Sequence, residues 1–381
     1  MKIYKILIFV LLTAISWADI RSDFPSYDYV LTEFNVNETF IDNPEFKRFV
    51  QKNKYEYRKR FIKAVNRGGL IIPSMKEMMY QRNISPVFLY VAMVESHFKL
   101  QATSRTKAQG LWQITKRTGK ELHLQMTNAV DERNDPVKST KAAIKYLTQI
   151  NKDFDKWYLT VMAYNCGPGC VKSSIRKAHS RDLATLINPR KNYIKNETKK
   201  YIKKVLLMAM IGENYLFDYK DSLGAMMHHV NSDSIASVRV RSGESLSNLA
   251  SILQMNMVYL KNINPHLIYG RAPSQRAYKI NIPHSKLNTF YTRYVGKHRV
   301  VTKEKVSKTF HASTSKQRVL QKQSYSNYSI YWVKKGDSLY SIARQYHSAV
   351  DAIQRLNNST STIITVGQKL LIPTYKQYAR N

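Results

Sequence analysis

Apolar positions recur at helical spacing through residues 46–215. One run follows Ser85-Pro86, a pair that suits a helix N-cap and first turn, and others follow Asp135-Pro136 and precede residue 210. Their apolar positions are Val87, Val91, Val94 and Phe98; Ala143, Leu147, Ile150 and Phe154; and Tyr201, Val205, Met208 and Ala209. Few alternating strand patterns occur here, so we predict one α-helical domain of about 170 residues, enough for a single core.

The pattern changes after residue 235 and then repeats. Each copy has a short strand, a Gly-acidic-Ser-Leu turn, a helix, an Asn in a second helix and a closing Ile-Pro strand. The landmarks are Gly243, Glu244, Ser245 and Asn264 in residues 236–284, and Gly336, Asp337, Ser338, Leu339 and Asn357 in residues 330–375. We therefore predict an α+β multidomain protein, a mainly helical domain followed by two small βααβ units.

The first eighteen residues have the pattern of a signal peptide. Lys2 and Lys5 precede an apolar core over residues 6–15, and Ser16-Trp17-Ala18 offers small residues for cleavage. The core is too short to span a membrane comfortably, and no later run is long enough, so we predict no transmembrane segment in the mature protein. No cysteine lies near the cleavage site. We expect export to the periplasm or cell envelope without a lipid anchor.

The remaining segments are predicted to be connections. Residues 19–45 are expected to form an irregular lead-in, residues 216–235 a linker and residues 376–381 a tail. Residues 284–329 hold ten Lys and Arg against one acidic residue, Glu304. We predict that residues 285–329 form a flexible, basic linker.

The chain is strongly basic, with 61 Lys and Arg against 26 Asp and Glu and a net charge of +35. Such a charge favours an anionic polymer as partner. Because the chain is expected to leave the cytoplasm, nucleic acid is excluded and an anionic envelope surface is expected instead. Lysines that merely solvate the surface explain the charge equally well.

Glu95 is the candidate reactive group of the helical domain. It lies beside Phe88 and Val91, at the edge of the apolar face that begins at Val87, where partial desolvation favours the neutral carboxyl and raises its pKa. A carboxylic acid of this kind can donate a proton near neutral pH. On this segment alone, a boundary glutamate paired with Lys or Arg is an open alternative.

The chain has two cysteines, Cys166 and Cys170, on either side of Gly167-Pro168-Gly169. An exported protein can form disulfides, and a turn over Gly-Pro-Gly can bring the two Cα atoms to the separation that a disulfide requires. Two separate buried thiols are the alternative. Two cysteines are too few for a metal site, and we expect neither a metal nor a cofactor.

Four sequence elements after residue 94 occur in a fixed order. They are Glu95-Ser96, Gly110-Leu111-Trp112-Gln113, Ala163-Tyr164-Asn165-Cys166-Gly167-Pro168-Gly169 and Glu197-Thr198-Lys199-Lys200-Tyr201. Together with Asp131–Pro136, this series resembles the lysozyme-like catalytic domain of lytic transglycosylases, over residues 40–215. Cys166 departs from the small residue usual at its position. The two small units resemble LysM modules, which bind N-acetylglucosamine chains.

The resemblance implies a reaction on peptidoglycan glycan strands. Glu95 would protonate the oxygen between N-acetylmuramic acid and N-acetylglucosamine, and would then take a proton from the muramyl C6 hydroxyl. That hydroxyl would close on C1 and leave a 1,6-anhydro sugar without consuming water. Typical glycosidases need a second carboxylate, and none is evident near Glu95 in the sequence.

The resemblance also assigns supporting roles around the sugar. Ser96, Gln113, Tyr164, Asn165, Glu197 and Tyr201 would bind substrate or orient Glu95, whereas Trp112 is expected in the core. In the LysM-like units, a glycan groove would form between the first turn and the loop before the last strand. Its candidate residues are Gly243, Glu244 and Ser245 in the first unit, and Gly336, Asp337, Ser338, Leu339 and Asn357 in the second. A turn that merely caps the first helix is the alternative.

Two other functions remain open at this point. A lysozyme-type hydrolase would use water and leave a reducing end, and the missing second carboxylate disfavours it. A non-catalytic wall-binding protein would keep the fold without the chemistry, and the retained Glu95, Gln113, Tyr164 and Asn165 disfavour it.

Overall fold

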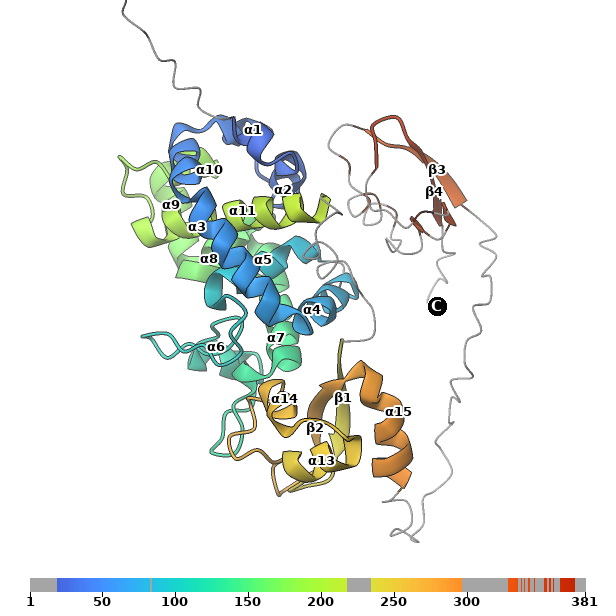
Figure 1. The fold of residues 1–381 in the computed structure, drawn as a ribbon. Helices are drawn as coiled ribbons and strands as arrows, with labels where there is room; N and C mark the ends of the chain where they lie inside the picture. The colour runs from blue at the N-terminus through green and yellow to red at the C-terminus, as the bar shows by residue number, and fades with distance from the viewer. Residues whose placement is uncertain are drawn as a thin grey trace, which may run out of the picture.

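The structure of the 381-residue chain is a computed structural model that describes residues 19–82, 84–217, 234–296, 328–334 and 364–373, and scattered positions from 337 to 359. The described residues form three hydrophobic cores: a large helical domain and two small strand-containing units (Figure 1). The predicted α+β multidomain class is therefore confirmed. The predicted signal peptide, residues 218–233 of the first linker and the tail lie outside the described residues.

The helical domain places two long helices, α3 and α11, against shorter ones. Its elements are α1 (Ile20–Asp23), α2 (Tyr27–Glu33), η1 (Glu38–Asp42), α3 (Pro44–Gly68), α4 (Ile71–Tyr80), η2 (Pro86–Phe88), α5 (Leu89–Ser96), α6 (Lys116–Glu121), η3 (Glu132–Asn134), α7 (Pro136–Phe154), α8 (Trp157–Cys166), α9 (Pro168–Ala178), α10 (Leu183–Leu186) and α11 (Asn196–Phe217). No described helix has the length and apolar character to cross a membrane.

The expectation of an irregular lead-in over residues 19–45 is wrong, because α1, α2 and η1 occupy it. Phe24, Val30 and Phe34 are fully buried in the main core. The side chains of Asp19 and Asn37 accept backbone N–H groups at the starts of α1 and η1. The segment contains many polar residues, yet its apolar residues are buried in the core of the helical domain.

Helix α5 lies in the centre of the helical domain. Its predicted start is confirmed: Ser85 accepts the Val87 N–H, and Pro86 opens the short helix η2 that leads into α5. The helix is buried on nearly all sides rather than along one face, and Tyr90, Ala92 and Met93 are fully buried. It packs against α4 and α11, so only its last turn, with Glu95, reaches the surface.

Helices α7 and α11 follow the predicted periodicity. Asp135 accepts the N–H groups of Val137 and Lys138 at the start of α7, as expected of an N-cap. Every apolar position predicted for these two helices is buried: Ala143, Leu147, Ile150 and Phe154 in α7, and Tyr201, Val205, Met208 and Ala209 in α11.

The first small unit has the predicted strand-helix-helix-strand order. Its elements are β1 (Ile235–Val240), α13 (Leu246–Leu253), α14 (Met257–Asn262) and β2 (Tyr278–Pro283), followed by η4 (His284–Lys286), α15 (Leu287–Thr289) and the π-helical η5 (Phe290–Val295). Strands β1 and β2 are antiparallel, from Ile235 opposite Pro283 to Val240 opposite Tyr278.

The predicted flexible linker over residues 285–329 is wrong at its start. Residues 284–295 are helical, and Phe290 and Tyr294 are buried in the core of the first unit. Their rings stack with centroids 4.8 Å apart. An aromatic pair in a basic stretch is therefore part of the unit, whereas residues 297–327 lie outside the described residues.

The second small unit pairs β3 (Tyr328–Trp332) with β4 (Lys369–Pro373), also antiparallel. One asparagine occupies the same place in both units. Asn264 donates to the Asn281 carbonyl and accepts the Asn281 N–H, both at 2.7 Å. Asn357 makes the same two bonds with Leu371, at 2.7 and 2.8 Å. In both units an asparagine is thus hydrogen-bonded to the closing strand in the same way.

Candidate active site

The Glu95 carboxyl lies at the end of α5, partly buried against α11. The Tyr201 hydroxyl donates to Glu95 Oε1 at 2.6 Å. Among the residues that the structure describes, Oε2 has no hydrogen-bond partner and the carboxyl makes no ion pair. The alternative of a boundary glutamate paired with Lys or Arg therefore does not hold within this part of the chain.

Burial raises the pKa of Glu95 to about 7. The hydrogen bond from Tyr201 and the charge of Lys204 act in the opposite direction, and the charge of Glu197 adds a small further rise. Lys204 lies one turn after Lys200 on α11 and was not singled out from the sequence. The carboxyl can hold a proton near neutral pH and can also release it.

Tyr164 stands near Glu95 and is held by the loop before α6. Its hydroxyl donates to the Trp112 carbonyl at 2.7 Å. Burial first, then the neighbouring charge of Glu95, raises the pKa of Tyr164 well above its usual value, so the hydroxyl stays protonated. Burial and Glu95 act on Tyr201 in the same way. Two neutral hydroxyl donors therefore accompany one carboxyl.

The loop over residues 102–114 is folded around Gln113. The Gln113 amide donates to the carbonyls of Ala102 and Gly110, at 3.0 and 2.8 Å. Gly110 has φ +79°, and any Cβ there would collide with the Arg133 carbonyl oxygen. Trp112 is fully buried and donates to Thr140, as expected for a core residue. Gln113 therefore shapes the loop, with its amide nitrogen already engaged.

Asn165 and Glu197 come together at the start of α11. Asn165 Oδ1 accepts from the Thr198 hydroxyl at 2.8 Å, and among the described residues its Nδ2 has no acceptor. Glu197 is exposed, and the Tyr164 hydroxyl donates to the Trp112 carbonyl rather than to Glu197. Asn165 keeps a donor for a ligand, whereas Glu197 contributes charge.

Ser96 is not placed to touch a substrate. Only 3% of the residue is exposed, and its hydroxyl donates to the Ala92 carbonyl one turn back in α5. The expectation of a substrate-binding Ser96 is therefore wrong for this structure. The residue terminates the helix beside His97, which adopts φ +52°.

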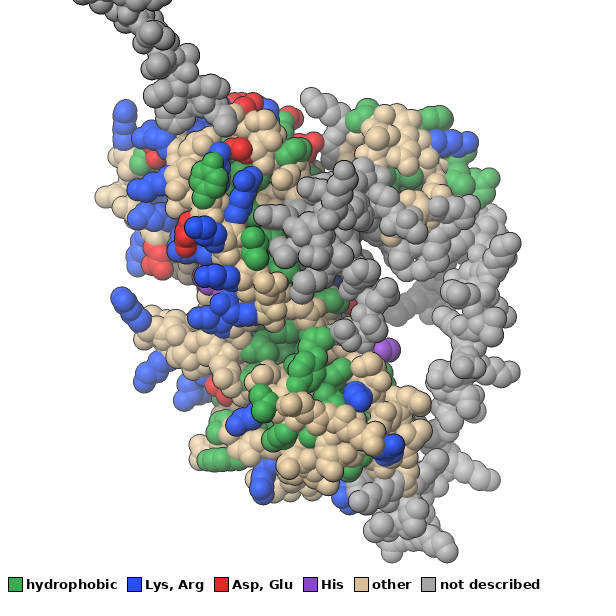
Figure 2. All heavy atoms as spheres, in the orientation of Figure 1, with side chains coloured by type: hydrophobic (Ala, Val, Ile, Leu, Met, Phe, Trp, Pro, Cys, Tyr) green, Lys and Arg blue, Asp and Glu red, His purple; other side chains and the backbone are tan. Residues whose placement is uncertain are grey.

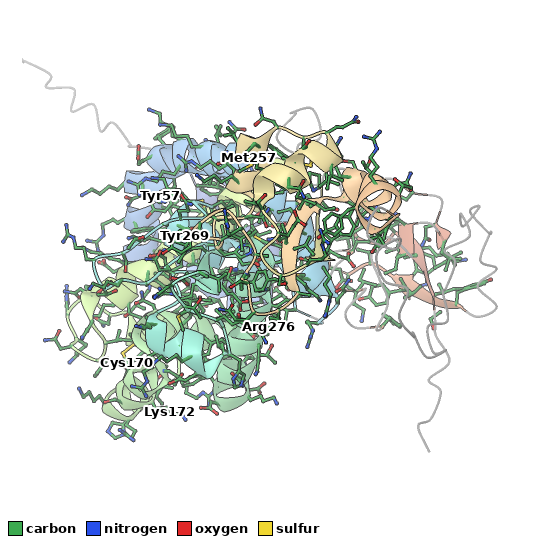
Figure 3. All side chains as sticks on the ribbon, turned by 90° about the horizontal axis from the view of Figure 1, so that it is seen from below. Tyr57, Cys170, Lys172, Met257, Tyr269 and Arg276 are labelled. Carbon is green, nitrogen blue, oxygen red and sulfur yellow. A yellow bond between two sulfur atoms is a disulfide. The ribbon has the colours of Figure 1, made fainter. Side chains whose placement is uncertain are left out.

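Cys166 and Cys170 form a disulfide, with Cα atoms 5.9 Å apart. It closes the corner between α8 and α9 at Gly167, whose φ is +90° (Figure 3 labels Cys170). The corner directly follows Tyr164 and Asn165, so the bond fixes the end of the helix that bears them.

The predicted glycan-binding turn of the first unit is largely occupied by internal bonds. Glu244 is 6% exposed, and its carboxylate accepts from Asn248 at 2.6 Å and from Tyr294 at 3.0 Å. Ser245 caps α13 by accepting the Asn248 N–H. The expectation that Glu244 faces a glycan is wrong, because the helical residues 284–295 cover it.

The second unit shows a similar turn in part. Asp337 accepts from the Tyr331 hydroxyl at 2.6 Å and from the Lys334 N–H at 2.7 Å. Leu339 is buried, and Asn357 is the internal fastening described above. Gly336 and Ser338 lie outside the described residues. Within the described part of the chain, no cluster of His, Cys, Asp or Glu is arranged to hold a metal ion.

Comparison with known families identifies two domains. The family described as Transglycosylase SLT domain matches residues 73–187, which include Glu95, Gln113 and Tyr164. The family described as LysM domain matches residues 331–373, the second small unit.

Several known proteins are similar to this chain. Membrane-bound lytic murein transglycosylase D of Escherichia coli is 27% identical over 329 residues, which cover 84% of this chain and 68% of that protein. A peptidoglycan transglycosylase of Escherichia phage T7 is 36% identical over 109 residues, 28% of this chain and 8% of that protein.

A solved structure of the lytic transglycosylase Slt from Pseudomonas aeruginosa aligns with a TM-score of 0.31 and 22% identity, over 36% of this chain and 23% of that one. The two domain matches and the similarity to transglycosylase D along most of the sequence confirm the predicted resemblance. The chain therefore carries a transglycosylase SLT domain and a LysM domain, and it is similar to a lytic murein transglycosylase over most of its length.

Proposed function

We propose that the protein cleaves the β-1,4 bond between N-acetylmuramic acid and N-acetylglucosamine of peptidoglycan and leaves a 1,6-anhydromuramyl end. One observation carries the proposal: the partly buried Glu95 has a pKa of about 7 and a neutral Tyr201 hydroxyl on one oxygen only. The other oxygen has no partner in the described structure and is available for the glycosidic oxygen.

In the first step, protonated Glu95 gives its proton to the leaving oxygen. A carboxyl with a pKa near the working pH is suited to this role, since it is protonated often enough and still acidic enough to donate. The C1–O bond breaks as the sugar's 2-acetamido oxygen closes on C1. Glu95 is left as a carboxylate, which Tyr201 stabilises by its hydrogen bond.

In the second step, the Glu95 carboxylate takes the proton of the muramyl C6 hydroxyl. The C6 oxygen then attacks C1 and displaces the acetamido oxygen, so the ring closes and Glu95 is protonated again. An attack within one sugar needs no bound water and gains from proximity. One carboxyl is sufficient for both proton transfers, so this mechanism needs no second carboxylate.

The surrounding groups fit supporting roles. Tyr201 orients Glu95, and Asn165 keeps an amide donor for an acetamido or hydroxyl oxygen. Tyr164 and Gln113 hold the loop that borders the site. Glu197 adds negative charge near Glu95 and so favours its protonated form. The site therefore has one proton-transfer group and several positioning groups.

We further propose export to the cell envelope, with the LysM domain holding the enzyme on its glycan. The basic surface supports contact with an anionic envelope. On α3, Lys52, Lys59, Lys63 and Arg67 are all exposed, and Figure 2 shows Lys and Arg side chains spread over the helical domain.

The test is digestion of purified peptidoglycan by the mature protein and by Glu95→Gln, with the sugar ends identified by mass spectrometry. Glu121→Gln is the matched control, because Glu121 is exposed and, within the described part of the chain, its ion-pair partner is Arg117 on α6. Anhydromuramyl ends from wild type and control, but not from Glu95→Gln, are expected. Reducing ends would make the protein a hydrolase, and wall binding without release would favour a non-catalytic role.

A further inference from the structure

The segment over residues 126–135 lies between the first small unit and the loop over residues 102–114, which borders Glu95 and is called the active-site loop below. In Figure 1 the first unit sits directly against the part of the helical domain near α6 and α7. The contact is built from backbone, side-chain and apolar interactions.

Two backbone hydrogen bonds join the segment to the first unit as a short antiparallel bridge. The Asp131 N–H donates to the His266 carbonyl at 2.9 Å, and the Ile268 N–H donates to the Ala129 carbonyl at 3.0 Å. Between them, Val130 pairs with Leu267. Val130 is 1% exposed and belongs to the core of the first unit, although it comes from the helical domain.

Buried side chains reinforce the bridge. The Tyr278 hydroxyl donates to Glu132 Oε1 at 2.7 Å, and Lys138 Nζ binds the same oxygen at 2.6 Å. Asn281 donates to Asp135 Oδ1 at 3.1 Å. These hydrogen bonds hold the first unit in one position on the helical domain, because each buried polar group would lose its partner if the unit moved away.

Apolar contact completes this interface between the first unit and the helical domain, which is called the joint below. Leu70 and Ala129 of the helical domain pack against the core of the first unit. On the opposite strand, the Ile235 N–H donates to the Ser74 hydroxyl of α4 at 2.8 Å. Figure 2 shows hydrophobic side chains gathered where the two parts meet. The unit is therefore attached at both β1 and β2.

On its other side, the same segment is hydrogen-bonded to the active-site loop through Arg133. Asp131 holds the Arg133 guanidinium with two bonds, at 2.9 and 2.7 Å. Arg133 Nη1 donates to the carbonyls of Lys107 and Ile114, at 3.1 and 3.4 Å. These two residues bracket Gly110, which packs on the Arg133 backbone.

The loop then reaches the reactive carboxyl in two contacts. Its Trp112 carbonyl accepts the Tyr164 hydroxyl, and Tyr164 lies within electrostatic reach of Glu95. The path from the first unit therefore runs through Asp131, Arg133, Trp112 and Tyr164. Arg133 contacts the loop by hydrogen bonds and backbone packing, Trp112 accepts a hydrogen bond from Tyr164, and the last step to Glu95 is electrostatic.

The turn that would bind glycan in the first unit is closed by the unit's own loop. The Gly243 N–H donates to the Pro273 carbonyl at 3.0 Å, and the Leu246 N–H to the Gly270 carbonyl at 2.9 Å. The Ala272 N–H donates to the Glu244 carbonyl at 2.8 Å. Figure 3 labels Tyr269 and Arg276 in this loop. The amides expected to meet acetamido groups are thus engaged internally.

We propose that residues 234–296 serve as a fixed support for the active-site loop rather than as a glycan-binding module, and that Arg133 is the positioning residue through which the support acts. The proposal rests on the proposed function for the reaction that the loop assists. It predicts that loosening the joint impairs turnover, while binding to the wall is retained.

The experiment compares three variants of the full mature chain on soluble peptidoglycan fragments. Arg133→Lys keeps the charge but loses the forked geometry, and Tyr278→Phe removes one hydroxyl at the joint. Tyr294→Phe is the matched control, because it removes a buried tyrosine–carboxylate bond within the same unit, away from the joint. We expect kcat to fall about 10- to 100-fold for Arg133→Lys and about 3- to 10-fold for Tyr278→Phe, because small misplacements near the reacting groups are costly.

Two further readouts separate positioning from simple loss of stability. A loosened loop admits water to Glu95, so the alkaline limit of the kcat profile should move to lower pH in both joint variants, with sacculus binding unchanged. Wild-type kcat and pH profile in folded Arg133→Lys and Tyr278→Phe would overturn the proposal. So would loss of sacculus binding with kcat intact.

Hydrogen exchange on the wild type tests the joint without any mutation. The amides of Asp131 and Ile268 should be as protected as those of α7, and rapid exchange at both would overturn the proposal. A wild-type protein that releases no sugar would contradict the proposed function, whereas protected amides in that protein would still establish the docked unit.

Discussion

The two small units share a fold and differ in what their surfaces face. In both units an asparagine, Asn264 or Asn357, is hydrogen-bonded to the closing strand. The first turns Tyr278 and Asn281 toward the helical domain and buries them there. The second exposes Tyr328, Ile330 and Trp332 along β3, each more than half exposed. One fold can therefore serve as internal support in one copy and as an open surface in the other.

The strands show how this difference is encoded. Outward positions of β1 are polar, Ser237 and Arg239, whereas those of β3 are apolar. Alternation places every second residue outward, so a few substitutions change the exposed face without changing the core. An exposed apolar strand face commonly marks a binding surface.

The largest expected effect separates cleavage from binding. Glu95→Gln should lower kcat by about 10²- to 10⁴-fold, the usual contribution of a general acid–base group. Sacculus binding should be unaffected, since Glu95 lies in the helical domain. Release assays and pull-downs on the same sacculi measure both, and loss of binding together with cleavage would contradict the division of roles.

The same variant should change stability in a pH-dependent way. The folded-state pKa of Glu95 is raised to about 7, so the folded protein keeps this proton between about pH 4.5 and 7 after the unfolded chain has lost it. Wild type therefore loses stability as pH rises through this window, and Glu95→Gln does not. We expect the variant to gain about 1–2 kcal/mol relative to wild type between pH 4 and pH 8, allowing for partial exposure.

Removing the shared asparagine should affect the two units differently. Asn264→Ala leaves buried groups of Asn281 and Leu260 without partners, at a cost of about 2–4 kcal/mol, and should also lower kcat through the joint. Asn357→Ala removes the same bonds from a less buried site, so it should cost less and reduce sacculus binding only. Thermal melts, kcat and pull-downs distinguish them; equal losses of kcat would break the comparison.

Acidification should loosen the joint of the first unit. His266 is fully buried, 3.4 Å from Asp135, and burial lowers its pKa despite the opposing charges of Asp135 and Glu132; Lys138 lowers it further. Below about pH 6.5 the unfolded histidine takes up a proton that the folded one resists, so the fold loses stability as pH falls. Tm should drop by about 2–4 °C more in wild type than in His266→Gln between pH 7.5 and 5. Parallel curves for the two proteins would contradict this assignment.

The smallest expected effect concerns the open face of the second unit. Trp332→Ala should weaken sacculus binding by about 3- to 10-fold, because an exposed aromatic ring offers a packing surface for sugar rings. Arg239→Ala, at an outward position of β1, is the control and should bind as wild type does. Neither change should alter Tm by much, since both side chains are exposed. Identical binding by both variants would assign the glycan to another face.

Sequence periodicity identified the helical domain and three of its helices, α5, α7 and α11, because buried positions at intervals of three and four leave a clear pattern. It predicted the capped starts at Ser85 and Asp135 and the buried face of α11, all of which the structure confirms. It missed the helices of residues 20–42 and 284–295, which are short and mostly polar. Their few aromatic residues, such as Phe34 and Phe290, become informative only when the core that receives them is known.

The sequence by itself determined the order of the domains, the family resemblance and the choice of Glu95, since these depend on residue types and local spacing. Only the tertiary structure decided which groups surround that carboxyl. Tyr201, which bonds to Glu95, is 106 positions away from it in the sequence. Ser96 directly follows Glu95, yet it is buried and bonds within its own helix. Local sequence patterns also could not predict the docking of the first unit, because the hydrogen bond between Tyr278 and Glu132 joins residues 146 positions apart. Pairs so distant in sequence leave no periodic signal, and their geometry exists only once the chain has folded.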